Sequence, residues 1–177
     1  MRVFWEKGYE GATMNDLTSA MKINRSSLYT IFGDKESLFR KTIQRYKEGP
    51  VAFVWDSVKQ PTARRTVEVL LTQAVALLAD PNNPRGCLSV QGALACGTEA
   101  QAARLAMIEF RKTGEAVLKE RFARAQADGE ISRKLNPGDL ARYVLTLLTG
   151  LGVQAANGAT KAELEAIVAM ALRALPF

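Results

Sequence analysis

The 177-residue sequence contains no histidine and only two cysteines. Without histidine the chain cannot form a Ser-His-Asp or Cys-His catalytic pair, and it lacks the commonest protein ligand for zinc. Two cysteines are too few for the disulfide framework of a small secreted domain. We therefore expect no catalytic residues, no metal and no cofactor, and we expect the protein to work in the reducing cytoplasm.

Long hydrophobic runs are also missing. The longest apolar stretches, residues 67–79 and 143–156, are shorter than the roughly 20 residues of a membrane-spanning helix and contain polar side chains. We therefore expect no membrane partner. The 24 Lys and Arg residues exceed the 18 Asp and Glu residues, and the net charge of +6 permits contact with nucleic acid without requiring it.

Strand-like alternation is nearly absent, whereas apolar residues recur at three- and four-residue spacing over most of the chain. The pattern predicts an all-α protein with three short helices followed by about six longer ones. Residues 1–46 are expected to form one domain and residues 47–177 a second, larger domain. A first helix over residues 1–7 has about two turns, too few for stability on its own, so we expect further residues upstream of Met1.

The first domain carries a helix-turn-helix pattern. Thr13 and Asp16 have the spacing of a capping box at the start of a second helix, and Asn24 can cap a third helix over residues 25–32. In that third helix the inward face is predicted to hold Leu28, Ile31 and Phe32. The outward face is then formed by Arg25, Ser26, Tyr29 and Thr30, with Ser27 near the boundary.

An outward face of arginine, hydroxyl groups and tyrosine suits the major groove of DNA. The alternative is that Tyr29 packs on a neighbouring helix and that the serines only support the helix start. Lys35 lies in the first turn of the next helix, where the helix dipole disfavours a cation but a bound phosphate favours one. Lys35 can equally be solvated and paired with a local acid.

Two segments together resemble the opening signature of TetR/AcrR regulators: the run Phe4–Met14 followed by Asp16-Leu17, and Ser27-Leu28-Tyr29, Phe32 and Lys35–Phe39. The resemblance covers roughly residues 3–46. It implies an N-terminal three-helix helix-turn-helix domain followed by a larger helical ligand-binding and dimerisation domain. It also implies DNA contacts from Thr13, Arg25, Ser26, Ser27, Tyr29, Thr30 and Lys35, with Tyr29 and Lys35 mostly on phosphates.

The resemblance further implies a homodimer that pairs through the last two long helices as a four-helix bundle. The apolar positions expected at this interface are Leu140, Val144, Leu147, Leu148, Leu151, Leu164, Ile167, Val168, Ala171 and Leu172. In a monomer the same positions are ordinary core. Gly150 and Gly152 would allow close approach of two backbones.

A pocket for a small organic effector is implied as well, although each of its candidate residues can equally belong to a solid core. The expected lining comprises Phe53, Leu88, Gln91, Met107, Phe110, Phe122 and Tyr143. Cys87 and Cys96 would lie roughly 13 Å apart on one straight helix, too far for a disulfide. Small buried side chains are favoured over redox sensors at both positions.

The sequence therefore predicts a DNA-binding transcriptional regulator, a repressor that binds a palindromic operator as a homodimer and is released by its effector. The expected partners are double-stranded DNA, a second copy of the chain and a small organic molecule. Two alternatives remain open: a helical protein-interaction module, and a small-molecule enzyme with a vestigial helix-turn-helix.

Overall fold

The computed structural model describes residues 1–94 and 96–177, and every regular element in these residues is helical. The expected all-α class is confirmed. The helices, with a 3-10 turn labelled η1, are α1 (Arg2–Gly11), α2 (Met14–Met21), α3 (Arg25–Phe32), α4 (Lys35–Glu48), α5 (Phe53–Ser57), α6 (Ala63–Ala79), α7 (Leu88–Gln91), η1 (Thr98–Ala100), α8 (Gln101–Ala127), α9 (Pro137–Ala156) and α10 (Lys161–Ala174).

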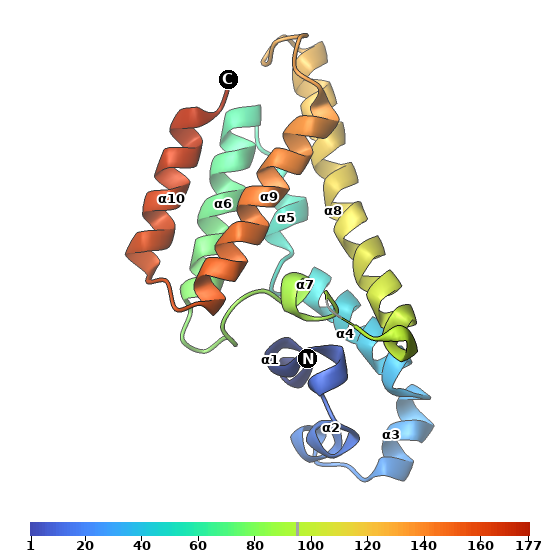
Figure 1. Ribbon diagram of the computed structural model, residues 1–177. Coiled ribbons are helices and arrows are strands. Elements are labelled where there is room, and N and C mark those ends of the chain that lie inside the picture. The colour runs from blue at the N-terminus through green and yellow to red at the C-terminus, as the bar shows by residue number, and fades with distance from the viewer. Residues whose placement is uncertain (95) are drawn as a thin grey trace.

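Helices α1, α2 and α3 form a small unit at one end of the molecule, and α4 leads from it into a larger helical body (Figure 1). In the body, α8 packs along α9, and α6 packs against both α9 and α10. Two of the helices expected to be long are short: α5 spans five residues and α7 spans four. No helix in the described residues combines the length and hydropathy needed to cross a bilayer.

Local capping determines where the long helices of the body begin. The Thr62 side chain accepts the Arg65 amide at the start of α6, and Asn136 accepts two amides at the start of α9, which has Pro137 in its first turn. At the start of α10, Thr160 and Glu163 form a complete capping box. These side chains satisfy amides that have no partner inside the helix.

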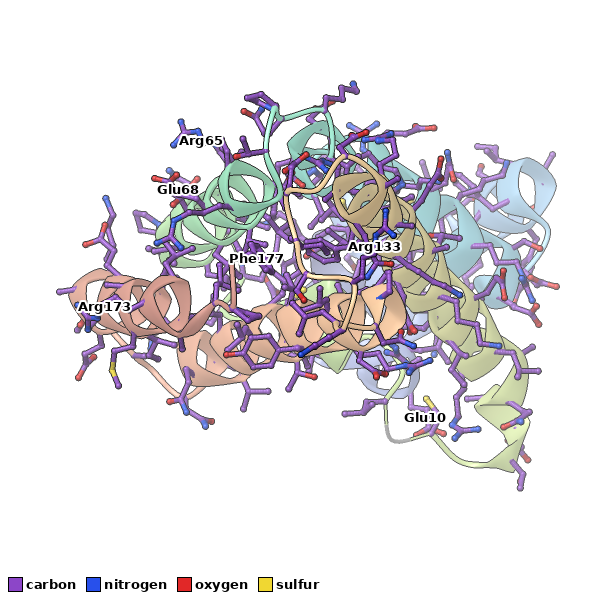
Figure 2. The ribbon with its side chains drawn as sticks, turned by 90° about the horizontal axis from the view of Figure 1, so that it is seen from above. Glu10, Arg65, Glu68, Arg133, Arg173 and Phe177 are labelled. Carbon is purple, nitrogen blue, oxygen red and sulfur yellow. The ribbon has the colours of Figure 1, made fainter. Side chains whose placement is uncertain are left out.

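One hydrophobic core runs through both units. Phe4 and Phe39 meet edge to face at 5.1 Å in the small unit, and Trp5 meets Tyr46 at 4.9 Å where α1 and α4 approach the body. At the opposite end, Phe177 turns back toward the centre of the body, as seen from above in Figure 2. Its ring lies 6.0 Å from that of the fully buried Phe122.

The segment around α7 joins the small unit to the body. The Trp5 indole donates to the carbonyl of Gly86 at 3.0 Å, and the Tyr9 amide donates to the carbonyl of Gly92 at 2.7 Å. Gly8, inside α1, has φ 68° and ψ 179°, a conformation that essentially only glycine adopts. This break in α1 places the Tyr9 amide against the end of α7.

Candidate DNA interface and effector cavity

The predicted helix-turn-helix is present with the predicted caps. Thr13 and Asp16 form the capping box of α2, and the Asn24 side chain accepts the Ser27 amide at 2.7 Å to cap α3. Between the two helices the chain turns at Lys22, which has a left-handed backbone (φ 55°). The Lys7 ammonium, 2.6 Å from the Asp16 carboxylate, and then the Thr13 hydroxyl and amide lower the pKa of Asp16 to about 2.

The outward face of α3 is as predicted: Arg25, Ser26, Tyr29 and Thr30 are exposed, and Ser27 is half-buried. Tyr29 is 50% exposed, which disfavours the alternative in which its ring is packed on a neighbouring helix. The Arg25 guanidinium donates to the side-chain oxygen of Asn15 on α2 at 2.9 Å. Asn15 therefore orients Arg25, a contact that no local sequence pattern signals.

The prediction for Ile31 is wrong. It was expected on the inward face of α3 with Leu28 and Phe32, but it is 56% exposed, whereas Leu28 is fully buried. Leu28 and Phe32 are one turn apart and bear on the core, so that Ile31 falls on the flank of this short helix. Ile31 thus adds an apolar side chain to the exposed surface of α3.

Two predicted contact residues already have partners within the chain. The Thr13 hydroxyl donates to Asp16 at 2.7 Å as part of the capping box. The Lys35 ammonium lies 4.6 Å from the centre of the Tyr9 ring, a cation–π contact that explains how a cation is tolerated in the first turn of α4. Burial lowers the pKa of Lys35, while the nearby Glu10 acts in the opposite direction.

A cavity of about 100 Å³ lies inside the body between α4, α5, α6, α8 and α9. Its lining residues are Tyr46, Val51, Phe53, Val54, Trp55, Ala74, Leu77, Leu78, Cys87, Ser89, Phe110, Arg111, Gly114, Leu145, Leu148 and Thr149. An open groove of about 610 Å³ on the α8–α9 surface shares Arg111, Leu145 and Thr149 with the cavity wall.

Of the seven residues expected to line an effector pocket, two line this cavity and five do not. Phe53 and Phe110 line the cavity. Leu88, Met107 and Phe122 are fully buried in solid core outside it, because periodicity identifies apolar residues without revealing where packing leaves a space. Gln91 and Tyr143 are exposed on the surface.

Polar groups gather at one side of this otherwise apolar cavity. The Tyr46 hydroxyl and the Cys87 thiol are hydrogen-bonded at 3.2 Å, and Cys87 lies 2.9 Å from the Ser89 hydroxyl. Burial, followed by the neighbouring Cys87, holds the pKa of Tyr46 well above its usual value. Arg111 donates to the carbonyl of Ser89 at 2.6 Å. Cys87 lies outside α7, and both cysteines are free thiols.

Six of the ten residues expected at a dimer interface lie in the protomer's own core. They are Leu140, Val144, Leu151, Leu164, Val168 and Ala171, all less than 9% exposed. Leu147, Leu148, Ile167 and Leu172 are half-buried, and Leu148 lines the cavity. Helices α9 and α10 pack their most apolar faces against α6 and α8 of the same protomer, and their neighbouring faces do not take part in this packing.

Gly152 makes its close approach inside the protomer. A Cβ atom at this position would lie 3.0 Å from the Cβ of Cys87, whereas one at Gly150 would meet open space. Each of α9 and α10 also has an exposed second face that carries mainly small or apolar side chains at three- and four-residue spacing, and the face of α10 ends at the charged Arg173. The members are Tyr143, Thr146, Gly150 and Val153 on α9, and Ala162, Ala166, Ala169 and Met170 on α10.

Residues 1–42 match the family model "Bacterial regulatory proteins, tetR family", and residues 63–171 match "Tetracyclin repressor-like, C-terminal domain". The TetR-family transcriptional regulator CifR, solved as a cysteine mutant with 26-base-pair operator DNA, is 39% identical; the match covers 99% of this chain and 92% of that one, with a TM-score of 0.94. The transcriptional repressor ComR of Escherichia coli K12 is 26% identical over 99% of this chain and 85% of its own. A regulator from Streptomyces coelicolor, 18% identical over 99% of this chain and 91% of that one with a TM-score of 0.79, shares the fold.

Proposed function

Because the chain belongs to the TetR family of bacterial regulatory proteins, we propose that it is a cytoplasmic repressor that binds a palindromic operator as a homodimer. A small organic effector releases it from the DNA. Residues 1–46 serve DNA binding, and residues 47–177 serve effector binding and dimerisation. The relative CifR was solved on double-strand operator DNA, which supports the assignment of DNA as the partner.

The observation that carries the proposal is the exposed face of α3. This helix contains no acidic residue, and its surface offers a guanidinium, three hydroxyl groups and the Ile31 side chain. Guanidinium and hydroxyl groups donate to base edges and phosphates in the major groove, and an aliphatic side chain suits the methyl group of thymine. Arg25 and Ile31 therefore have the chemistry for base contacts, while Tyr29 suits a phosphate.

Thr13 and Lys35 flank this face and complete the proposed set of DNA contacts: Thr13, Arg25, Ser26, Ser27, Tyr29, Thr30 and Lys35. The Thr13 hydroxyl is occupied in its capping box, so its position contributes mainly the free amides at the start of α2. The Lys35 ammonium lies over the Tyr9 ring, and with three N–H donors it can reach a phosphate while it keeps this contact.

The test is operator binding measured by fluorescence anisotropy over a salt series, with DNA from upstream of the gene. Tyr29→Ala and Lys35→Ala should both weaken binding, and the lysine variant should flatten the slope of log K against log salt by about one. Lys59→Ala removes an exposed lysine at the far end of the body and is the matched control. Indifference to both changes would show that operator binding does not depend on these proposed contacts of α3 and α4.

We propose that the dimer forms through the exposed second face of α9 and α10 rather than through their buried face. Val153 and the 64%-exposed Met170 lie in this stripe. The wild-type chain should show twice its 19.4 kDa mass by light scattering, and Val153→Glu or Met170→Glu should shift it toward the monomer. Leu105→Glu, at an apolar residue of α8 whose exposure lies between those of Val153 and Met170, should leave the mass unchanged.

Dimerisation places the two α3 helices on one face of DNA, about 34–36 Å apart, which is why a palindromic operator is expected. The cavity lies between α4, which carries the DNA-binding unit, and α9, which carries the dimer face. An effector that binds one dimer shape better than the other shifts the spacing of the α3 helices. A coupling of about 1–3 kcal/mol changes operator affinity roughly 5- to 150-fold.

A further inference from the structure

The cavity has an aromatic end. Four aromatic side chains line it. The ring centres of Trp55 and Phe110 are 6.0 Å apart in a tilted arrangement, those of Tyr46 and Phe110 are 6.3 Å apart in an edge-to-face arrangement, and Phe53 is the fourth. The volume of about 100 Å³ is about two-thirds that of a cavity of roughly 150 Å³ that holds benzene, so there is space for no more than one ring. The hollow therefore has the size and lining for one aromatic ring.

The cavity also has a cationic side. Among the described residues that line it, Arg111 carries the one full charge. No acid in residues 1–94 and 96–177 lies within 4 Å of its guanidinium, and Glu115, one turn along α8, is paired with Arg142 at 3.0 Å. Burial, followed by the neighbouring Arg104, lowers the pKa of Arg111. A half-buried cation without a counterion is electrostatically unfavourable, and a bound anion removes that cost.

We propose that the cavity binds a small aromatic carboxylate, with its ring among the aromatic side chains and its carboxylate paired with Arg111. This inference rests on the proposed role of the cavity as the effector site. The planar guanidinium can bind a carboxylate through two parallel hydrogen bonds. The groove that shares Arg111, Leu145 and Thr149 with the cavity provides the route by which the ligand enters.

The same pairing explains how the ligand acts on DNA binding. Arg111 holds the carbonyl of Ser89 in α7, and the end of α7 holds the Tyr9 amide of the DNA-binding unit through Gly92. A carboxylate is a stronger acceptor for a guanidinium than a backbone carbonyl is. The ligand therefore draws Arg111 away from Ser89 and loosens the contact that positions α1.

The experiment compares benzoate with benzamide, which has the same shape but no charge, by isothermal titration calorimetry on the full chain. Benzoate should bind at least about tenfold more tightly than benzamide. Arg111→Met should abolish that difference while it retains benzamide binding, which reports an intact cavity. Arg111→Lys should recover part of the preference. Lys119→Met, which removes an exposed cation of α8 outside both hollows, should change neither ligand.

Operator binding by the wild-type chain is measured in parallel, with and without benzoate. Release from the operator by benzoate but not by benzamide supports the inference. Three results would overturn the inference: equal affinity for the two probes, no binding of either probe, or unchanged benzoate affinity in Arg111→Met. In each case the proposed function still stands if the chain binds the operator. A chain that binds benzoate through Arg111 but binds no operator overturns the proposed function instead.

Discussion

Replacing Gly8 with alanine tests the junction between the DNA-binding unit and the body. Gly8 holds φ 68° and ψ 179°, and a Cβ atom there would lie 3.0 Å from the carbonyl oxygen of Gln91. A non-glycine residue in such a conformation costs about 1–3 kcal/mol. Taken at about 2 kcal/mol, the loss should lower the melting temperature of a chain of this length by about 4–8 °C.

The assay combines thermal unfolding by circular dichroism with hydrogen exchange at the Tyr9 amide, which donates to Gly92. In Gly8→Ala this amide should exchange faster, because the new methyl group pushes α1 away from the end of α7. Gly129→Ala is the matched control, since Gly129 also has a positive φ (79°) but faces open space. It should melt lower through strain alone and leave Tyr9 protected. A Gly8→Ala variant with wild-type melting and a protected Tyr9 amide would refute the reasoning.

Three further predictions concern single side chains. Gly114→Ala should raise stability by about 0.5–1 kcal/mol in urea unfolding, because the site is helical and an added Cβ would meet no atom within 4 Å outside the adjoining helix backbone. The same change should weaken benzoate binding by filling part of the cavity. Cys87→Ala should cost about 1–3 kcal/mol in the same assay by leaving the buried Tyr46 hydroxyl without its partner, whereas Cys87→Ser should recover most of the loss. The Asp16 carboxyl should titrate near pH 2 by NMR, and Lys7→Met should raise this pKa. Because folding lowers the pKa, the ionised carboxylate stabilises the fold above about pH 4, and this effect is lost as the pH falls toward 2.

The helix-turn-helix was predictable from the sequence because its signals are local. Thr13 and Asp16 are three residues apart, and so are Asn24 and Ser27, so each cap forms within one turn and does not depend on the rest of the fold. The outward face of α3 was predictable in the same way, from residue spacing within one short helix. Ile31 escaped prediction because its burial depends on how α3 is tilted against its neighbours, which helical periodicity does not specify.

The cavity and the proposed dimer interface were poorly predictable for a related reason. Periodicity identifies an apolar face, but it does not say whether that face meets the same chain, a second chain or an empty space. Leu140 and Val144 are as apolar as an interface requires, yet they bury themselves within the protomer. No sequence pattern marks Arg111 as a cavity residue. A cation on a long helix is normally solvated, and only the fold shows that a cavity lies beside this one.

Residues 86–92 connect the three surfaces that a repressor must coordinate. This segment accepts hydrogen bonds from Trp5 and Tyr9 of the DNA-binding unit and from Arg111 at the cavity. It also approaches α9, since a Cβ atom at Gly152 would lie 3.0 Å from the Cβ of Cys87. It contains only one short turn of helix, which is marginal without these contacts. A change at any one contact therefore shifts the others more easily than it would through a long, rigid helix. For this reason we expect substitutions in this segment to alter the link between effector binding and operator binding more than they alter either affinity alone.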